Sequence, residues 1–116
     1  KDLSFLLNEC RRVLKRNGYI VLSTPNYYSL WPIIEIILNT VSPINYNHQH
    51  INKFNKKKLL KFIKKKGFKI SELNTFILFS PFLAFISFKL ALRMLKFDNF
   101  FTKFLPGFLL FLKAKK

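Results

Sequence analysis

The stretch Arg16-Asn17-Gly18-Tyr19-Ile20-Val21-Leu22-Ser23-Thr24-Pro25-Asn26 decides the fold class of this 116-residue chain. Asn17-Gly18 supplies a tight turn with a left-handed residue, and residues 19–24 form a nearly unbroken apolar run rich in β-forming side chains. Such a run predicts a strand covered on both faces, as in a parallel sheet, and Pro25 is expected to end it. Because a helix is predicted before this strand, the order of elements is that of half an α/β unit.

Two helices are predicted on either side of this strand. Residues 2–16 place apolar side chains at spacings of three and four, with cations on the other side and toward the C-terminal end. Cys10 lies on the apolar stripe of this helix, so it is expected to be a buried structural thiol. Residues 30–38 predict a second, short helix with Glu35 on its water-facing side.

A third helix has clear boundary signals. Asn55 is a good N-cap, and Gly67 is the residue expected just after the last turn. Its buried face is apolar and its remaining positions are mostly lysine. Residues 68–76 then predict a strand that weakens toward its end, and residues 108–112 predict a last apolar strand.

The segment 76–104 is rich in phenylalanine and differs from the rest of the chain. Ser80-Pro81 predicts the start of a helix, whose second half acquires a polar side from a stripe formed by Lys89, Arg93 and Lys96. The charge-free stretch 73–88 is shorter than the roughly 20 residues needed to cross a bilayer, and it contains Pro81. A transmembrane helix is therefore not expected, whereas an interfacial helix or a pocket cover stays open.

The net charge of +16 limits the kinds of partner that we expect for this chain. Nine of the 17 lysines lie in residues 53–69, which contain no acid. This block is read either as a solvated helix face or as a surface for anionic lipid or phosphate. No RNA-binding or helix-turn-helix pattern is present, so a nucleic-acid partner is not expected. The single cysteine favours a reducing, cytoplasm-facing environment.

In their order and spacing, these elements resemble the C-terminal half of class I S-adenosylmethionine-dependent methyltransferases, and most closely the type 11, small-molecule and quinone-type subgroup. The resemblance is carried by three stretches, which are residues 9–15 with 17–19, the strand end at 23–26, and the run from His50 through Gly67-Phe68. Arg16-Asn17-Gly18 replaces the family's usual Pro-Gly-Gly turn.

This resemblance implies a Rossmann-like sheet in which the last strand is antiparallel and lies between the other two. It implies that residues 1–116 are the C-terminal part of a single methyltransferase domain, with 76–104 as an apolar insertion or lid. The N-terminal half of that domain, which binds S-adenosylmethionine, is expected to be absent from this chain. The three glycines are isolated, so this chain contains no glycine-rich cofactor loop and no cofactor-binding residue is assigned in it. The chain opens mid-helix at Lys1 and is expected to be a fragment, inactive alone, with the residue 19–24 strand at an unpaired sheet edge.

Candidate site residues follow from the carboxyl ends of the strands, where open α/β sheets bind ligands. Asn26, Tyr27 and Tyr28 begin the loop after the first strand and are interpreted as substrate-binding residues, with turn formation and packing as the alternative. His48 is assigned to substrate binding and His50, by the resemblance, to a catalytic base, with loop fixation as the alternative. Two histidines without acidic or cysteine partners do not make a metal site.

The leading functional reading is a cytoplasmic methyltransferase that acts on a small-molecule or lipid-like acceptor. An anionic membrane surface is a further expected partner, with the protein peripheral to that membrane. The alternative is a non-catalytic peripheral membrane or anion-binding α/β protein, and a degenerate methyltransferase-like subunit is a third reading. The acceptor and the oligomeric state do not follow from the sequence.

Overall fold

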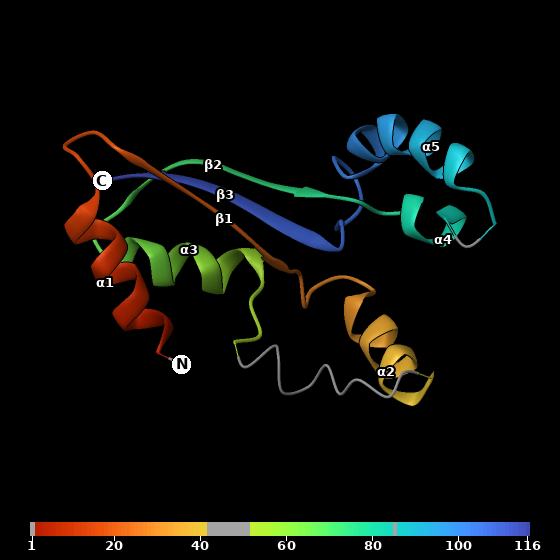
Figure 1. Ribbon diagram of the computed structural model, residues 1–116, viewed down its shortest axis with the longest axis horizontal. Coiled ribbons are helices and arrows are strands. Elements are labelled where there is room, and N and C mark those ends of the chain that lie inside the picture. Colours follow the sequence, from red (N-terminus) through yellow and green to blue (C-terminus); the bar gives the residue numbers. More distant parts are fainter. Residues whose placement is uncertain (1, 42–51, 85) are drawn as a thin grey trace.

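The computed structural model describes residues 2–41, 52–84 and 86–116 and forms a mixed α/β fold (Figure 1). A sheet of order β1-β3-β2 joins β1 (Tyr19–Pro25), β2 (Lys69–Phe76) and β3 (Leu109–Lys115), and β3 is antiparallel to both neighbours. The expected central, antiparallel last strand is therefore confirmed. Because β1 and β2 run parallel, their carboxyl ends reach the same edge of the sheet. The helices are α1 (Leu3–Val13), α2 (Trp31–Val41), α3 (Lys56–Lys65), α4 (Ser80–Ala84) and α5 (Phe88–Phe101).

Helix α3 has the N-cap that the sequence predicts, and α1 begins at an N-cap of its own at Asp2, so the expectation that the chain opens mid-helix is wrong. The Asp2 carboxylate accepts the backbone N–H of Ser4 at 2.8 Å, and Asn55 Oδ1 accepts that of Lys58 at 2.9 Å. Gly67 has a φ of 77° after α3, as predicted. Helix α1 ends at Val13, short of the predicted residue 16, and the left-handed turn before β1 is made by Asn17 at φ 68°.

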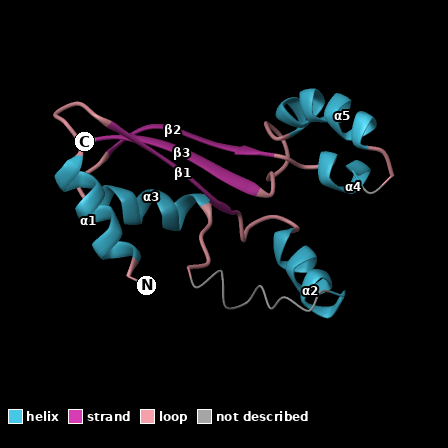
Figure 2. Ribbon diagram, in the orientation of Figure 1, coloured by secondary structure: helices cyan, strands magenta, loops and turns pink. Residues whose placement is uncertain are grey.

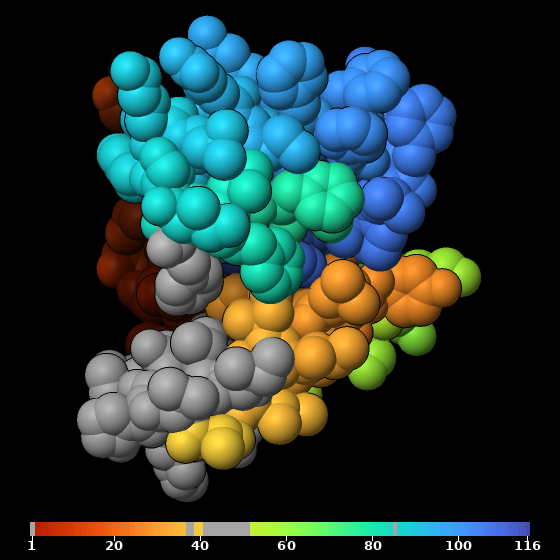
Figure 3. All heavy atoms as spheres, turned by 90° about the vertical axis from the view of Figure 1, so that its right-hand side faces the viewer, coloured from red at the N-terminus to blue at the C-terminus, as the bar shows by residue number. Residues whose placement is uncertain are grey.

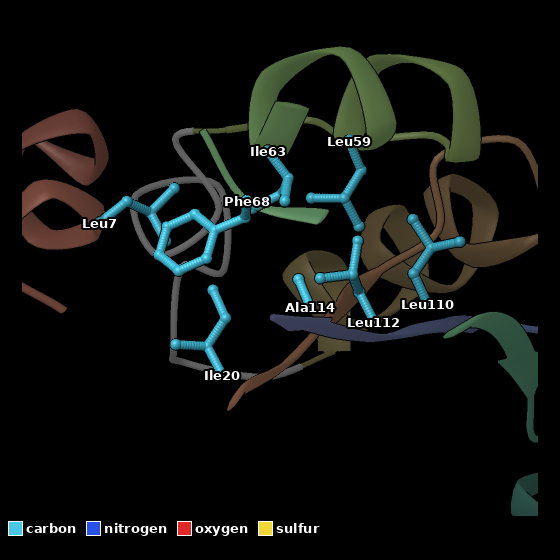
Figure 4. Packing of buried hydrophobic residues seen from close by; sticks show 8 residues of the cluster. All are labelled: Leu7, Ile20, Leu59, Ile63, Phe68, Leu110, Leu112 and Ala114. Atoms are coloured by element: carbon cyan, nitrogen blue, oxygen red, sulfur yellow. The ribbon is translucent and has the colours of Figure 1, made fainter. Parts of the chain in front are cut away.

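Helices α1 and α3 both pack on one face of the sheet, and the hydrophobic core lies between them and the strands (Figure 4). In β3 every second residue points into this core, and Leu110, Leu112 and Ala114 have no exposed surface. Their intervening neighbours lie on the other face of the sheet, as the alternation of side chains along a strand requires. The cluster consists of Leu7, Ile20, Leu59, Ile63, Phe68, Leu110, Leu112 and Ala114.

The prediction that the first strand is covered on both faces is wrong for this structure. Ile20 is 9% exposed on the core side, whereas Val21 on the opposite side is 58% exposed. In the residues that the structure describes, both packing helices lie on the same side of β1, so its second face has no layer above it (Figure 1). The apolar side chain of Val21 is therefore exposed, not buried.

The phenylalanine-rich segment forms a helical hairpin at the carboxyl edge of the sheet, with two helices instead of the single one predicted (Figure 2). The predicted start at Ser80 is confirmed, and the Ser87 hydroxyl oxygen caps α5 by accepting the N–H of Leu90 at 3.5 Å. No helix in the described ranges is both long and apolar enough to cross a membrane.

Asp98 of α5 holds this helix to the segment that joins β2 to the start of α4. Its buried carboxylate accepts the backbone N–H groups of Leu78, Phe79 and Ser80 at 3.0–3.1 Å and the Ser80 hydroxyl at 2.6 Å. Burial by itself raises the pKa of Asp98, but the hydrogen bonds from Ser80 and the three N–H groups together hold that pKa below its ordinary value. The start of α4 is thus capped by a carboxylate that lies 18 residues further along the chain.

Candidate functional site

Asn26 joins the carboxyl end of β1 to the beginning of β3. Its backbone N–H donates to the Phe108 carbonyl at 2.7 Å, and its Nδ2 donates to the Gly107 carbonyl at 2.9 Å. Its Oδ1 accepts the N–H of Tyr28 at 3.1 Å, so this side chain also shapes the turn that follows. Asn26 is 2% exposed, and its amide positions the surrounding backbone.

The same junction requires a glycine at position 107. A Cβ atom there would lie 2.7 Å from the carbonyl oxygen of Phe76 and 2.9 Å from its nitrogen, which is closer than real Cβ contacts allow. Gly107 therefore lets the end of β2 pass close to the start of β3. Together with Asn26, Gly107 holds the backbone in place at the carboxyl edge of the sheet.

An open pocket of about 550 Å³ lies at this edge, where α3 begins. Its size is within the range of pockets that bind small molecules. The segment 102–106 after α5 forms its far wall. The lining residues are Asn26, Tyr28, Asn55, Lys56, Lys57, Thr75, Thr102, Lys103, Phe104, Leu105 and Pro106.

A second hollow of about 680 Å³ adjoins this pocket and extends it toward the end of β2. The two share Lys56, Thr75, Thr102 and Lys103 in their linings. Among the described residues, no acid lines either hollow, whereas three lysines line the first and two of them, Lys56 and Lys103, also line the second. The site at the carboxyl edge is therefore electrostatically positive.

Tyr27 is placed differently from its neighbours in the β1–α2 loop. Its hydroxyl donates to Glu35 Oε2 at 2.8 Å, and Lys53 Nζ lies 5.4 Å from the centre of its ring. Burial first, and then the Glu35 carboxylate, raise the pKa of Tyr27 to about 12. Glu35 is 4% exposed, so the expectation that it faces water is wrong. The Tyr27 hydroxyl gives this carboxylate a hydrogen-bond donor beneath α2.

The structure brings two of the predicted site residues to the pocket. Asn26 and Tyr28 line it, whereas Tyr27 is directed to Glu35 and is not among the lining residues. The predicted roles of His48 and His50 concern positions outside the described residues. Their assignment stays a prediction.

Sequence reasoning missed the lysines of the site. Lys56 and Lys57 belong to the run for which the sequence predicts a solvated face or a surface for anionic lipid or phosphate, and Lys103 lies in the segment 76–104. The sequence signal that could have found Lys56 and Lys57 is their position directly after the Asn55 N-cap, at the start of the helix that follows the candidate loop. No spacing in the sequence shows that Lys103 joins them.

The pocket does not fit S-adenosylmethionine itself. Its lining has no carboxylate for the ribose hydroxyls, and three lysines would repel the positively charged sulfonium. Among the residues in the described ranges, no group of three or more His, Cys, Asp or Glu side chains is placed to hold a metal ion. The lining suits the uncharged and anionic groups of another molecule.

No protein-family model matches the chain, and no curated protein matches it significantly.

Proposed function

We propose that this chain forms the acceptor-binding part of an S-adenosylmethionine-dependent methyltransferase domain of Rossmann-like architecture. The observation that carries the proposal is the sheet order β1-β3-β2, with an antiparallel last strand between two parallel ones and a pocket at their carboxyl ends. It supports the proposal because the resemblance, which covers residues 2–75 and extends to 105–116 as the last strand, implies this strand arrangement, and because ligands of open α/β sheets bind at this edge.

In this proposal the chain's own residues act by positioning. S-adenosylmethionine supplies the electrophilic methyl group and is held by residues other than those of the pocket. Methyl transfer is an in-line displacement, so the orientation of the acceptor contributes most of the rate enhancement. Asn26 lines the pocket and, through its bond to Gly107, holds the adjoining junction of β1 and β3. Tyr28 and the 102–106 wall orient the acceptor, while His50 stays the predicted base.

The coding sequence upstream of Lys1 tests this proposal. A strand that leads into a glycine-rich turn, with an acidic residue after the next strand, would support it. The longer protein is then expected to transfer a radiolabelled methyl group from S-adenosylmethionine to a small molecule or lipid from a cell extract. A start codon directly before Lys1 would overturn the proposal.

A second candidate function is docking on an anionic membrane, which would make the protein peripheral to it. The supporting observation is the α4–α5 surface, defined here as the exposed side chains of the hairpin and of the segment that follows it. Several of its apolar residues are more than half exposed, and Asp98, the one acid between residues 73 and 116, is buried. Figure 3 shows this end of the molecule, with the hairpin above α2. The surface consists of Phe82, Ile86, Phe88, Lys89, Leu92, Arg93, Lys96, Phe97, Phe100, Lys103 and Phe104.

The positions on α5 fit such a surface. At about 100° per residue, Lys89, Arg93 and Lys96 lie on the side of the helix opposite the buried Ala91 and Asp98. Exposed phenylalanine and leucine side chains flank this stripe on both sides. Cations that reach lipid phosphates beside apolar groups that enter the interface are typical of an interfacial helix.

Flotation with vesicles tests the membrane proposal. The triple variant K89Q/R93Q/K96Q is expected to lose about 3 kcal/mol of affinity for phosphatidylserine-containing vesicles, at about 1 kcal/mol for each cation. The matched control K61Q/K64Q/K65Q removes the same charge from α3 and should bind almost as the parent chain does. Equal losses in the two variants, or equal binding to pure phosphatidylcholine, would contradict docking through α5.

A further inference from the structure

We propose that the pocket at the carboxyl edge binds a phosphate or carboxylate group through Lys56, Lys57 and Lys103, with an apolar part of the same ligand against Phe104 and Leu105. The proposal rests on the proposed function only in calling this ligand the methyl acceptor. The binding site itself follows from the lining of the pocket.

The first argument is uncompensated charge. Three lysines from two distant segments, α3 and the 102–106 wall, converge on one hollow whose lining contains no acid. Across the part of the chain that the structure describes, the one ion pair joins Arg12 to Glu9, so none of the three lysines is neutralised by a carboxylate. Gathering like charges costs free energy, and a bound anion would offset that cost.

The second argument is the direction of α3. Lys56 is its first residue and lines both hollows, so the positive end of the helix dipole faces the same space as the lysine side chains. Asn55, Thr75 and Thr102 add uncharged hydrogen-bonding groups to the lining. An anion in this space would meet a field of one sign from both the side chains and the helix.

The third argument is the mixed chemistry of the lining. Besides three lysines and several amide and hydroxyl groups, it contains the apolar side chains of Phe104, Leu105 and Pro106, which follow Lys103 directly in the chain. A simple inorganic anion would use only the charged and polar groups. The lining therefore favours an amphiphilic anion, either a lipid with an anionic headgroup or a soluble organic phosphate or carboxylate.

Titration calorimetry on the 116-residue chain tests the site, with inorganic pyrophosphate and a short-chain, water-soluble phosphatidic acid as probes. Charge-assisted hydrogen bonds carry the binding, so K57Q/K103Q is expected to weaken both probes at least about tenfold. The matched control K61Q/K64Q removes the same charge from outside the pocket and should change the affinity less than about twofold by screening of distant charges. Equal weakening in the two variants, or no binding by the parent chain, would overturn the proposal.

The contribution of the apolar residues of the pocket is measured with a separate variant. Phe104 is 76% exposed, so Phe104→Ser leaves the core intact. It is expected to weaken phosphatidic acid several-fold and to leave pyrophosphate unchanged, and equal effects on both probes would overturn the assignment of these residues. Tighter binding of phosphatidic acid than of phenyl phosphate, a soluble amphiphilic anion, would point to a lipid source, and the reverse order to a soluble one. If neither binds more tightly than glycerol phosphate, the assignment of the apolar residues is overturned. No cofactor takes part in these measurements, so their failure is distinct from a failure of the methyltransferase proposal.

Discussion

Asp98 accepts four hydrogen bonds that join α5 to the link between β2 and α4, and its substitution gives a graded test of how the α4–α5 hairpin is held. In Asp98→Asn, the amide oxygen can replace Oδ2 and keep the three donors from Leu78 and Ser80. The NH2 group then faces the N–H of Phe79, so one hydrogen bond is lost and three lose their charge. At about 1 kcal/mol for each of these four changes, the free energy of unfolding should fall by roughly 3–4 kcal/mol at neutral pH.

Asp98→Ala removes all four hydrogen bonds and leaves four donors without their acceptor. Each such donor costs about 1–3 kcal/mol when buried, so the penalty is at least about 4 kcal/mol, a large part of the stability of a small domain. Part of this penalty is avoided by local opening, which exposes the donors to water. We therefore expect the hairpin to open before the core between α1, α3 and the sheet does.

Amide hydrogen exchange combined with urea denaturation measures both effects. Exchange at residues 78–80 and along α5 should accelerate strongly in Asp98→Ala, whereas α3 should change little. The matched control is Asn99→Ala, which truncates the exposed neighbouring residue and should shift stability by less than about 0.5 kcal/mol. Because the pKa of Asp98 is lowered on folding, its contribution is complete above the ordinary value and is lost as the pH falls through the lowered one. If Asp98→Ala and Asn99→Ala unfold at the same urea concentration, with unchanged exchange at residues 78–80, the argument is refuted.

Three further predictions concern the carboxyl edge and α3. Gly107→Ala should lower the free energy of unfolding by about 1–3 kcal/mol in a urea titration, because its Cβ would meet the Phe76 backbone; Gly18→Ala, with nearest contacts of 3.0 Å, should cost less. Tyr27 should ionise near pH 12 in an absorbance titration that compares the parent chain with Tyr27→Phe, with its stabilising contribution present below pH 10 and lost as the pH rises through about 12; ionisation of Tyr27 near pH 10 would contradict the Glu35 hydrogen bond. Asn55→Ala should cost about 1 kcal/mol in thermal unfolding through loss of the α3 cap, whereas Asn55→Asp should restore it, and identical melting of both variants would argue against the cap.

The elements with local signals were predictable from the sequence. The Asn55 cap, the positive φ of Gly67 and the strand over residues 69–76 depend on neighbouring residues, so a short window contains their cause. The antiparallel central position of β3 was predicted through a family resemblance, since no local signal in its apolar run specifies its neighbours.

The features that the sequence did not predict depend on contacts between residues that lie far apart in the chain. Nothing near Ser80 shows that its N–H is accepted by Asp98, and nothing near Glu35 shows that it lies buried against the Tyr27 hydroxyl. Lys56 and Lys57 belong to a charge run that predicts either a solvated face or a surface for anionic lipid or phosphate, and Lys103 lies outside that run and meets them only through the fold. Val21 is the opposite case. Its apolar side chain is compatible with a covered face of the sheet, but no element in the described residues covers it.

The uncovered face of the sheet has a consequence for the behaviour of the protein in solution. On this face Lys113 and Lys115 lie with their ammonium groups 4.8 and 6.0 Å from the centre of the Tyr19 ring, above a strand that also exposes Val21. These charges keep a second molecule from stacking on the bare strands, much as lysines protect the edges of natural sheets. Such repulsion is screened by salt, whereas the attraction between apolar surfaces is not. Self-association of the chain should therefore increase with ionic strength, so low-salt buffers are the ones in which it should stay dispersed.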